Sequence, residues 1–243
     1  MGADQHLDLR ASIASALEWW SAAGVDCEID DAPRDWLAHG RAVEAAVAAP
    51  SGLPETAAAA PLPSTLAAFV AWRSGPAAPE ARWPGQPIGV QGDAASGLMI
   101  VADMPDREDD RAGALLSGQV GQLFDRMLAA IGRDRQSVYI AALAAKRPPA
   151  GRVTDETADR LAELLRHHIA LAAPTRVLAL GNAASRALTG LDVAHARNAL
   201  RPINQQEGKA MVVASYHPRF LLERPAAKAD AWRDLQLLTG ETE

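Results

Sequence analysis

The 243-residue sequence contains only one cysteine, Cys27. A single thiol cannot form a disulfide within the chain, and it cannot supply a multi-cysteine zinc or iron–sulfur site. A lone cysteine is most often a small buried apolar residue, so Cys27 carries no functional hypothesis. Long apolar runs are also missing, because Val177–Leu180 and Met211–Ala214 are far shorter than the roughly 20 residues that span a bilayer. The amino terminus lacks a basic stretch followed by an apolar core, and we therefore expect a cytoplasmic protein with no membrane partner.

An excess of basic residues is likewise absent, since the formal net charge is −6. General nucleic-acid binding depends on Lys and Arg side chains that neutralise phosphates, so the total charge argues against it, although a local basic face remains compatible with this charge. The hydrophobic content of 49% is sufficient for a full core. We expect one main domain with an additional segment.

The first part of the chain is predicted to be a helical appendage followed by a linker. Apolar residues recur at helical spacing in three segments, and the stretches between them are rich in Pro, Ala, Gly and Ser. The appendage and linker occupy residues 1–90, and the main domain occupies residues 91–243. Helices are expected over residues 5–24, 33–48 and 64–72, and linkers over residues 49–64 and 75–97.

The main domain alternates short apolar runs with amphipathic segments, which is typical of βαβ units. Right-handed crossovers then favour an α/β fold, a three-layer α/β/α sandwich with a central four-stranded parallel sheet. The predicted strands are residues 98–103, 137–143, 176–181 and 209–216, and the predicted helices are residues 119–131, 155–173, 182–189 and 226–238.

Two polar residues lie at the carboxyl ends of predicted strands. His217 and the proline-fixed turn at Pro218 follow the last strand, and Asp103 ends the first. The carboxyl ends of parallel strands share one edge of the sheet, where open α/β folds bind ligands. His217 there can donate a hydrogen bond to a ligand, or it can be a turn histidine that bonds to the backbone. Asp103 can orient a water molecule, or it can cap the following turn.

Several segments, in order and in register, resemble the uracil-DNA glycosylase superfamily, most of all its bacterial family-4 type. The likeness covers residues 90–240, and the segments are Gly118–Leu128, Ser137–Ile140, Arg147–Pro149, Leu178–Gly181 and Tyr216–Pro218, with Ala231 and Trp232 downstream. The resemblance implies a protein that binds DNA, rotates a damaged or deaminated base out of the stack and hydrolyses its N-glycosidic bond. His217 matches the histidine of the family's His-Pro motif.

The sequence departs from the family pattern in the region expected to form the base pocket. Met104 and Pro105 belong to a first motif that keeps an acid and the proline but loses two glycines. The family's Pro-Phe pair, whose aromatic ring lies over the base, corresponds to Leu115 and Leu116, and its pyrimidine-reading asparagine corresponds to Ala142. Because sites built on such hydrogen bonds discriminate strongly, these losses weaken the prediction that uracil is the substrate. The resemblance thus places Met104, Pro105, Leu116 and Ala142 at the base pocket.

The cysteines that hold the family's iron–sulfur cluster are replaced, two of them by Lys146 and Leu161. We therefore expect no cofactor and no metal. The amino-terminal helices, or packing around Leu161, are expected to take over the stabilising role of the cluster.

Basic residues at the predicted ligand edge suggest a phosphate-binding strip, although scattered surface charge explains them equally well. These residues are Arg147, Arg152, Arg219 and Arg224.

Three functions remain open on the sequence. The first is a repair glycosylase with His217 and Asp103 in its pocket. The second is a catalytically reduced member that binds DNA, or that docks a repair partner through the tryptophan-bearing amino-terminal helices. The third is a hydrolase of small nucleosides or nucleotides. Incubation with oligonucleotides that contain deaminated bases distinguishes the three functions, according to whether abasic sites form and whether the DNA is bound.

Overall fold

The computed structural model of the chain describes Ser15 and residues 61–205 and 208–240. The helices predicted over residues 5–24 and 33–48, apart from Ser15, lie outside the described residues, and so does Cys27. The statements below therefore concern the part of the chain from residue 61 onward.

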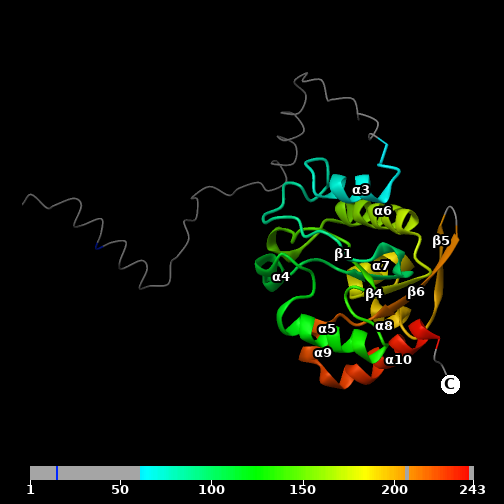
Figure 1. The fold of residues 1–243 in the computed structure, drawn as a ribbon. Coiled ribbons are helices and arrows are strands. Elements are labelled where there is room, and N and C mark those ends of the chain that lie inside the picture. The colour runs from blue at the N-terminus through cyan, green and yellow to red at the C-terminus, as the bar shows by residue number, and fades with distance from the viewer. Residues whose placement is uncertain (1–14, 16–60, 206–207, 241–243) are drawn as a thin grey trace, which may run out of the picture. The chain divides into compact units, whose positions relative to one another are not determined.

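A mixed sheet with the strand order β1-β3-β2-β4-β6-β5 forms the centre of this part (Figure 1). The four inner strands are parallel, as the sequence predicts. The strands are β1 (Gln91–Gly92), β2 (Leu98–Ala102), β3 (Tyr139–Ala142), β4 (Arg176–Leu180), β5 (Arg201–Gln205) and β6 (Gly208–Ser215).

The predicted four parallel strands form the centre of the sheet, and two antiparallel edge strands that were not predicted, β1 and β5, extend it to six strands. β1 has only two residues and lies in a stretch rich in Gly and Pro, so no alternating pattern marks it. β5 pairs with β6 and contains Pro202, a residue that sheets tolerate mainly in edge strands. Neither edge strand carries an apolar run that would reveal it in the sequence.

Helices cover both faces of the sheet and make the predicted three layers (Figure 1). The helices α5, α9 and α10 pack on one face, and α6 packs on the other with α3 outside it. The helices are α3 (Leu66–Arg73), α4 (Arg107–Ala112), α5 (Gly118–Ala130), α6 (Asp155–Ala172), α7 (Asn182–Thr189), α8 (Val193–Ala196), α9 (Pro218–Glu223) and α10 (Lys228–Thr239).

The alternation of side chains along β2 shows why its whole length is apolar. Ile100 faces the cluster with α5, and its neighbours Met99 and Val101 face the cluster with α6. A parallel strand between two helical layers buries both of its faces, so a continuous apolar run is expected there. All three side chains are fully buried.

Residues 61–90 pack against the sheet domain through buried polar contacts. The Glu80 carboxylate is fully buried and forms an ion pair with Arg73 at 2.7 Å. It also accepts a hydrogen bond from the backbone N–H of Ala145 at 3.0 Å. These contacts place residues 61–90 with the described unit Pro61–Glu243. The domain boundary after residue 90 stays a prediction.

The register of the inner strands brings four loops to one edge. Ala102 pairs with both Ala142 and Leu180, and Leu180 pairs with Ser215. The residues that follow these positions therefore lie at the same carboxyl edge of the sheet, as predicted for a ligand site.

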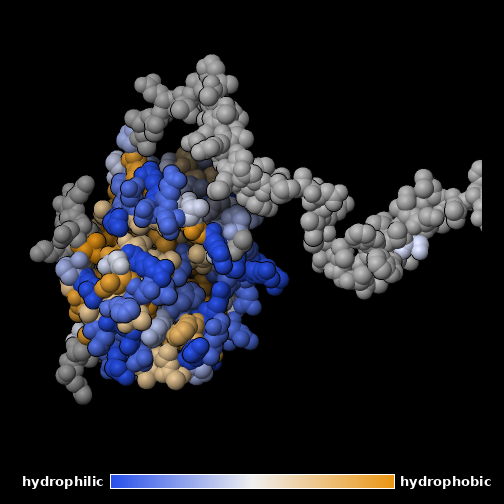
Figure 2. Space-filling model, turned by 180° about the vertical axis from the view of Figure 1, so that it is seen from behind, coloured by the Kyte–Doolittle hydropathy of each residue, from blue (hydrophilic) through white to orange (hydrophobic). Residues whose placement is uncertain are grey.

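One face of the described part is largely polar. Figure 2 shows hydrophilic residues over much of one face, with apolar residues in scattered patches. None of the described helices is both long and apolar enough to cross a membrane.

Candidate active site

A cleft of about 340 Å³ opens at the carboxyl edge of the sheet. Two of its walls come from segments far apart in the sequence. We call Asp103–Asp106, after β2, the acidic wall, and Tyr216–Phe220, after β6, the histidine wall. The residues that line the cleft are Asp103, Met104, Pro105, Arg147, Gly151, His217, Arg219, Phe220 and Glu223. The structure thus brings together both predicted catalytic residues and two of the four predicted pocket residues.

His217 is the N-cap of α9, and Pro218 is the first residue of that helix. Its Nδ1 accepts a hydrogen bond from the backbone N–H of Arg219 at 3.2 Å. Burial and, to a smaller extent, the nearby Arg219 guanidinium lower the pKa of His217 to about 4, against the opposite effect of Asp106. A neutral imidazole that accepts at Nδ1 carries its proton on Nε2. His217 can therefore present an N–H donor to a ligand in the cleft while it remains uncharged.

Asp103 holds the start of α7. Its Oδ1 accepts a hydrogen bond from the backbone N–H of Ala184 at 2.6 Å. Burial raises the pKa of Asp103, and the amide groups of Ala184 and Ala183 oppose this rise. A β-carbon on Gly181 would lie 2.3 Å from Asp103 Oδ2, and Gly181 has a φ of +105° that side-chain-bearing residues rarely adopt. The close fit of carboxylate and glycine backbone fixes Asp103 at the cleft.

A second hollow of about 230 Å³ shares Arg147 and Arg219 with the cleft. Arg219 forms an ion pair with Asp106. Although burial acts to raise it, the Asp109 N–H and Arg219 hold the pKa of Asp106 below its usual value. Arg147 and Arg219 thus lie at the mouth of the cleft, where the ion pair with Asp106 balances the charge of Arg219.

The other two predicted DNA-binding residues do not line either hollow. Arg152 and Arg224 are both exposed, and each follows a short turn next to a residue that does line the cleft. Their contact with DNA stays a prediction.

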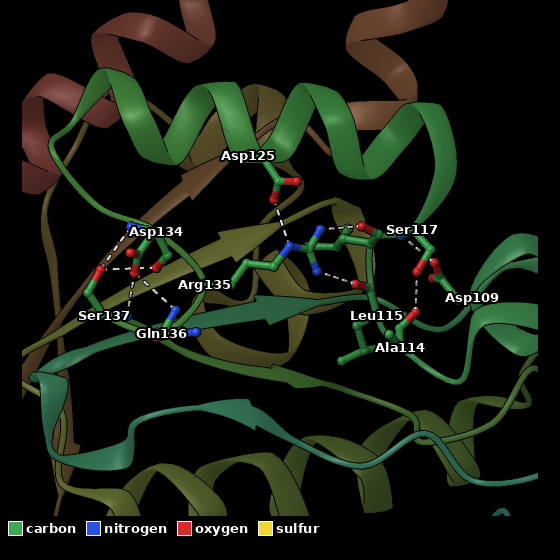
Figure 3. A network of polar contacts seen from close by, with 10 residues as sticks. Asp109, Ala114, Leu115, Ser117, Asp125, Asp134, Arg135, Gln136 and Ser137 are labelled. Carbon is green, nitrogen blue, oxygen red and sulfur yellow. Dashed lines mark hydrogen bonds and ion pairs between the residues drawn. The ribbon is translucent and has the colours of Figure 1, made fainter.

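Leu116 does not line the cleft, because its side chain is turned into the core. Leu115 and Leu116 are 1% and 2% exposed, and both belong to the cluster beneath α5. The Arg135 guanidinium donates hydrogen bonds to their two carbonyl oxygens and an additional one to Asp125, as Figure 3 shows for Leu115 and Asp125. Leu116 also has a φ of +54°. This polar clamp holds the predicted aromatic position away from the cleft.

Ala142 lies at the end of β3 and lines a different hollow. That hollow also contains Arg73 and His168, and it lies between β3 and residues 70–90. A role of Ala142 or Leu116 in base recognition therefore stays a prediction without a contact to the cleft.

Three residues of the cleft were not predicted from the sequence: Gly151, Phe220 and Glu223. Phe220 and Glu223 lie on α9, two residues and five residues after Pro218. Phe220 lies three residues after His217, and Glu223 lies three residues after Phe220. This spacing is the signal that places them close to His217, since residues three apart on a helix are neighbours on one face.

The two positions that correspond to cluster cysteines do not fit an iron–sulfur cluster. The Lys146 ammonium donates hydrogen bonds to the carbonyl oxygens of Ala81 and Trp83, at 3.0 and 3.3 Å. Leu161 lies on α6, is 1% exposed and packs in the core. A cationic ammonium and an aliphatic side chain supply no thiolate, and the whole sequence has one cysteine. The protein therefore has hydrogen bonds from Lys146 and apolar packing of Leu161 at these two positions.

Comparison with known proteins agrees with this architecture. The family model of the uracil DNA glycosylase superfamily matches residues 90–236, which is more than half of the chain. The type-4 uracil-DNA glycosylase of Pyrobaculum aerophilum is 28% identical over 161 residues, covering 62% of this chain and 80% of that protein. The type-4 enzyme of Archaeoglobus fulgidus is 27% identical over 146 residues, covering 57% and 73%. That of Thermotoga maritima is 30% identical over 134 residues, covering 54% and 69%. The chain therefore belongs to the uracil-DNA glycosylase superfamily.

Proposed function

We propose that the protein is a DNA glycosylase that accepts an extruded base in the cleft and hydrolyses its N-glycosidic bond, with His217 as the donor to the leaving base. The family match and the relatives support a base-excision-repair, glycosylase-like function and DNA as the partner. The position of His217 carries the assignment of the donor. Its Nδ1 is occupied by the Arg219 amide, and the ring lines an open cleft opposite Asp103.

The proposed reaction separates charge between the base and the sugar. The histidine wall stabilises the negative charge of the base, and the acidic wall stabilises the positive charge of the sugar. Cleavage of the bond between the sugar C1′ and the base nitrogen leaves an anionic base and an oxocarbenium-like sugar. The His217 Nε2–H hydrogen bond to a carbonyl oxygen of the base stabilises the anion as it forms. Water adds its hydroxide to C1′, and its proton balances the charge of the departing base.

Asp103 is proposed to act at the sugar. A carboxylate close to the oxocarbenium stabilises positive charge that is absent from the ground state. It can also orient the attacking water molecule. The reaction as proposed uses no metal ion and no cofactor.

The base itself is proposed only as a damaged or deaminated one. Ala142 cannot provide the paired donor and acceptor of an amide side chain, so the chain has no amide at that position to read uracil. Docking of a repair protein on the amino-terminal helices and a cytoplasmic location both stay predictions.

Labelled oligonucleotides with uracil, hypoxanthine or xanthine at one position test the proposal. Each is incubated with the wild-type protein, His217→Ala and Asp103→Ala, and alkali-labile abasic sites are counted. The exposed His195→Ala serves as the matched control. We expect excision of at least one base by wild type and by His195→Ala, and its loss in the two cleft variants. Equal excision by His217→Ala would contradict the assigned donor.

The second candidate is a catalytically reduced protein that binds DNA without excision. The core-facing Leu116 favours it, because the position of the family's aromatic contact is removed from the cleft. Salt-sensitive oligonucleotide binding with no abasic product from any base would support this candidate. Absence of both binding and product from DNA would leave the hydrolase of small nucleosides or nucleotides, which free nucleosides then test.

A further inference from the structure

Phe220 gives the cleft an aromatic surface, whereas the resemblance to the family places the aromatic residue at the position of Leu116. The residue lies in the first turn of α9, lines the cleft and is 37% exposed. One face of its ring stacks on Tyr216, with 4.9 Å between the ring centroids and 26° between the planes. Among the described residues that line the cleft, Phe220 carries the only phenyl ring. A planar ring that packs on one side and is partly exposed on the other can extend its stack.

The support beneath this stack is anchored in the core. The Arg197 guanidinium lies over the Tyr216 ring, 5.4 Å from its centroid. Arg197 Nε in turn lies 3.3 Å from Oδ2 of Asp234, which is fully buried. Asp234 also accepts hydrogen bonds from the Ser215 hydroxyl at 2.8 Å and from the Asn198 N–H at 3.1 Å. The ring of Tyr216 is therefore held in place before any ligand binds.

We propose that Phe220 is the surface on which the extruded base stacks, as the third member of a Tyr216–Phe220–base stack. This inference rests on the proposed function and names a contact within the same site. Stacking on an aromatic ring contributes to nucleobase binding and tolerates different bases, because every base has a π face. His217 lies three residues before Phe220, so the same wall supplies both the stacking surface and the edge donor.

Stacking on Phe220 predicts a broad specificity for the base. The position of the edge-reading amide is occupied by Ala142, whereas the stacking surface recognises a flat base without reading its edge. The cleft is therefore expected to accept several deaminated bases, pyrimidine and purine, with similar affinities. Discrimination would come from His217 alone, since its Nε2–H favours a base that carries a carbonyl oxygen.

The test measures how much of the DNA affinity depends on the base. Oligonucleotides, measured both as single strands and as duplexes, carry 2′-fluorodeoxyuridine, which resists cleavage, or a tetrahydrofuran abasic analogue at one position. Dissociation constants are measured for wild type, Phe220→Leu, Phe220→Trp and the control Leu222→Ala, which alters another exposed apolar residue of α9 outside the lining of the cleft. Base-dependent affinity is the ratio of the two constants.

We expect Phe220→Leu to reduce the base-dependent ratio by about tenfold, within the range of base–aromatic contacts. The affinity for the abasic oligonucleotide should stay unchanged, Phe220→Trp should keep the ratio, and Leu222→Ala should resemble wild type. An unchanged ratio in Phe220→Leu, with the wild type still excising a base, would overturn the stacking inference and leave the proposed function intact.

Two further outcomes are also decisive. A loss confined to duplex substrates would overturn stacking and indicate a wedge that inserts into the helix. A wild-type protein that neither excises a base nor distinguishes base from abasic site would overturn the proposed function and, with it, this inference.

Discussion

The histidine wall and the acidic wall of the cleft differ in how much of each side chain the fold already uses. Asp103 accepts a hydrogen bond from the start of α7 and fits against Gly181, and Asp106 caps α4 and pairs with Arg219. On the opposite wall, His217 uses only Nδ1, and Phe220 uses one face of its ring. The acidic wall therefore mainly stabilises the local structure, which we call its framework role. The histidine wall leaves the Nε2–H of His217 and one ring face of Phe220 available to a ligand.

The largest expected effect comes from His217→Asn. Asparagine is a good N-cap, so α9 should keep its start and the free energy of unfolding should change little. The shorter amide cannot place a donor where Nε2 lies, and excision should fall by roughly 100- to 1,000-fold, as for loss of one oxyanion donor. Single-turnover kinetics and thermal denaturation of the same preparation measure both quantities. A large loss of stability together with activity would break the proposed contrast between the walls.

Gly181→Ala tests the framework role of the acidic wall. The new β-carbon would lie 2.3 Å from Asp103 Oδ2 at a φ of +105°, so the chain must shift. We expect a loss of about 3 kcal/mol in the free energy of unfolding, because steric conflict adds to the backbone strain. The matched control is Gly190→Ala, with a φ of +74° and no atom within 4 Å of the added carbon.

The control should cost only the strain of a left-handed residue, about 1 kcal/mol. Urea denaturation compares the two variants. Equal costs would show that the fit between Asp103 and Gly181 contributes nothing, and the acidic wall would then not be part of the framework.

The pKa of His168 tests whether a perturbed histidine alone marks a functional wall. His168 is 6% exposed, and its Nε2 lies 2.8 Å from the Tyr139 hydroxyl on the far face of the sheet. Burial, together with the smaller effects of the nearby Arg73 and His167, lowers its pKa to about 4. The pKa of His217 falls to a similar value, but only His217 lines the cleft. Access to a ligand therefore separates the two histidines, and the pKa does not.

Acid titration of stability checks this interpretation. With a folded pKa near 4 and an unfolded value near 6.5, the unfolded state binds protons first as the pH falls. Stability is therefore complete above pH 6.5 and is lost between pH 6.5 and 4, by up to roughly 3 kcal/mol from His168. Because His217 titrates over the same pH range, His168→Gln should reduce this loss by about half in pH-dependent urea denaturation, and His195→Gln should leave it unchanged. A His168→Gln profile as steep as that of wild type would contradict the assignment.

The fold was largely predictable, because it depends on patterns that are local in sequence. Met211–Ala214 and Val177–Leu180 are continuous apolar runs bounded by polar turns, and parallel strands between two helical layers require such runs. The edge strands β1 and β5 escaped prediction, because pairing to a neighbour defines them and no apolar pattern does.

The predicted residues that line the cleft all lie in or just after the loops at the carboxyl ends of strands. His217 and Asp103 were placed at the carboxyl edge by this position, and both line the cleft. Leu116 was placed by alignment alone, but the Arg135 clamp, whose donor lies 19 residues further along the chain, turns the loop into the core. Phe220 was missed because only three-dimensional structure shows that it stacks on Tyr216 and lines the cleft.

Arg147→Gln has the smallest expected effect and tests whether the charge of Arg147 at the mouth of the cleft contributes to DNA binding. Arg147 lines both hollows, so a phosphate contact there would be lost with its charge. We expect DNA affinity to fall a few-fold for every sequence, and the slope of log affinity against log salt to shrink by about one unit. Arg133→Gln, at the opposite edge of the sheet beside Thr175, is the matched control and should leave the slope unchanged. If both variants change the slope equally, the total charge of the protein determines the binding, and the mouth of the cleft does not preferentially contact the DNA backbone.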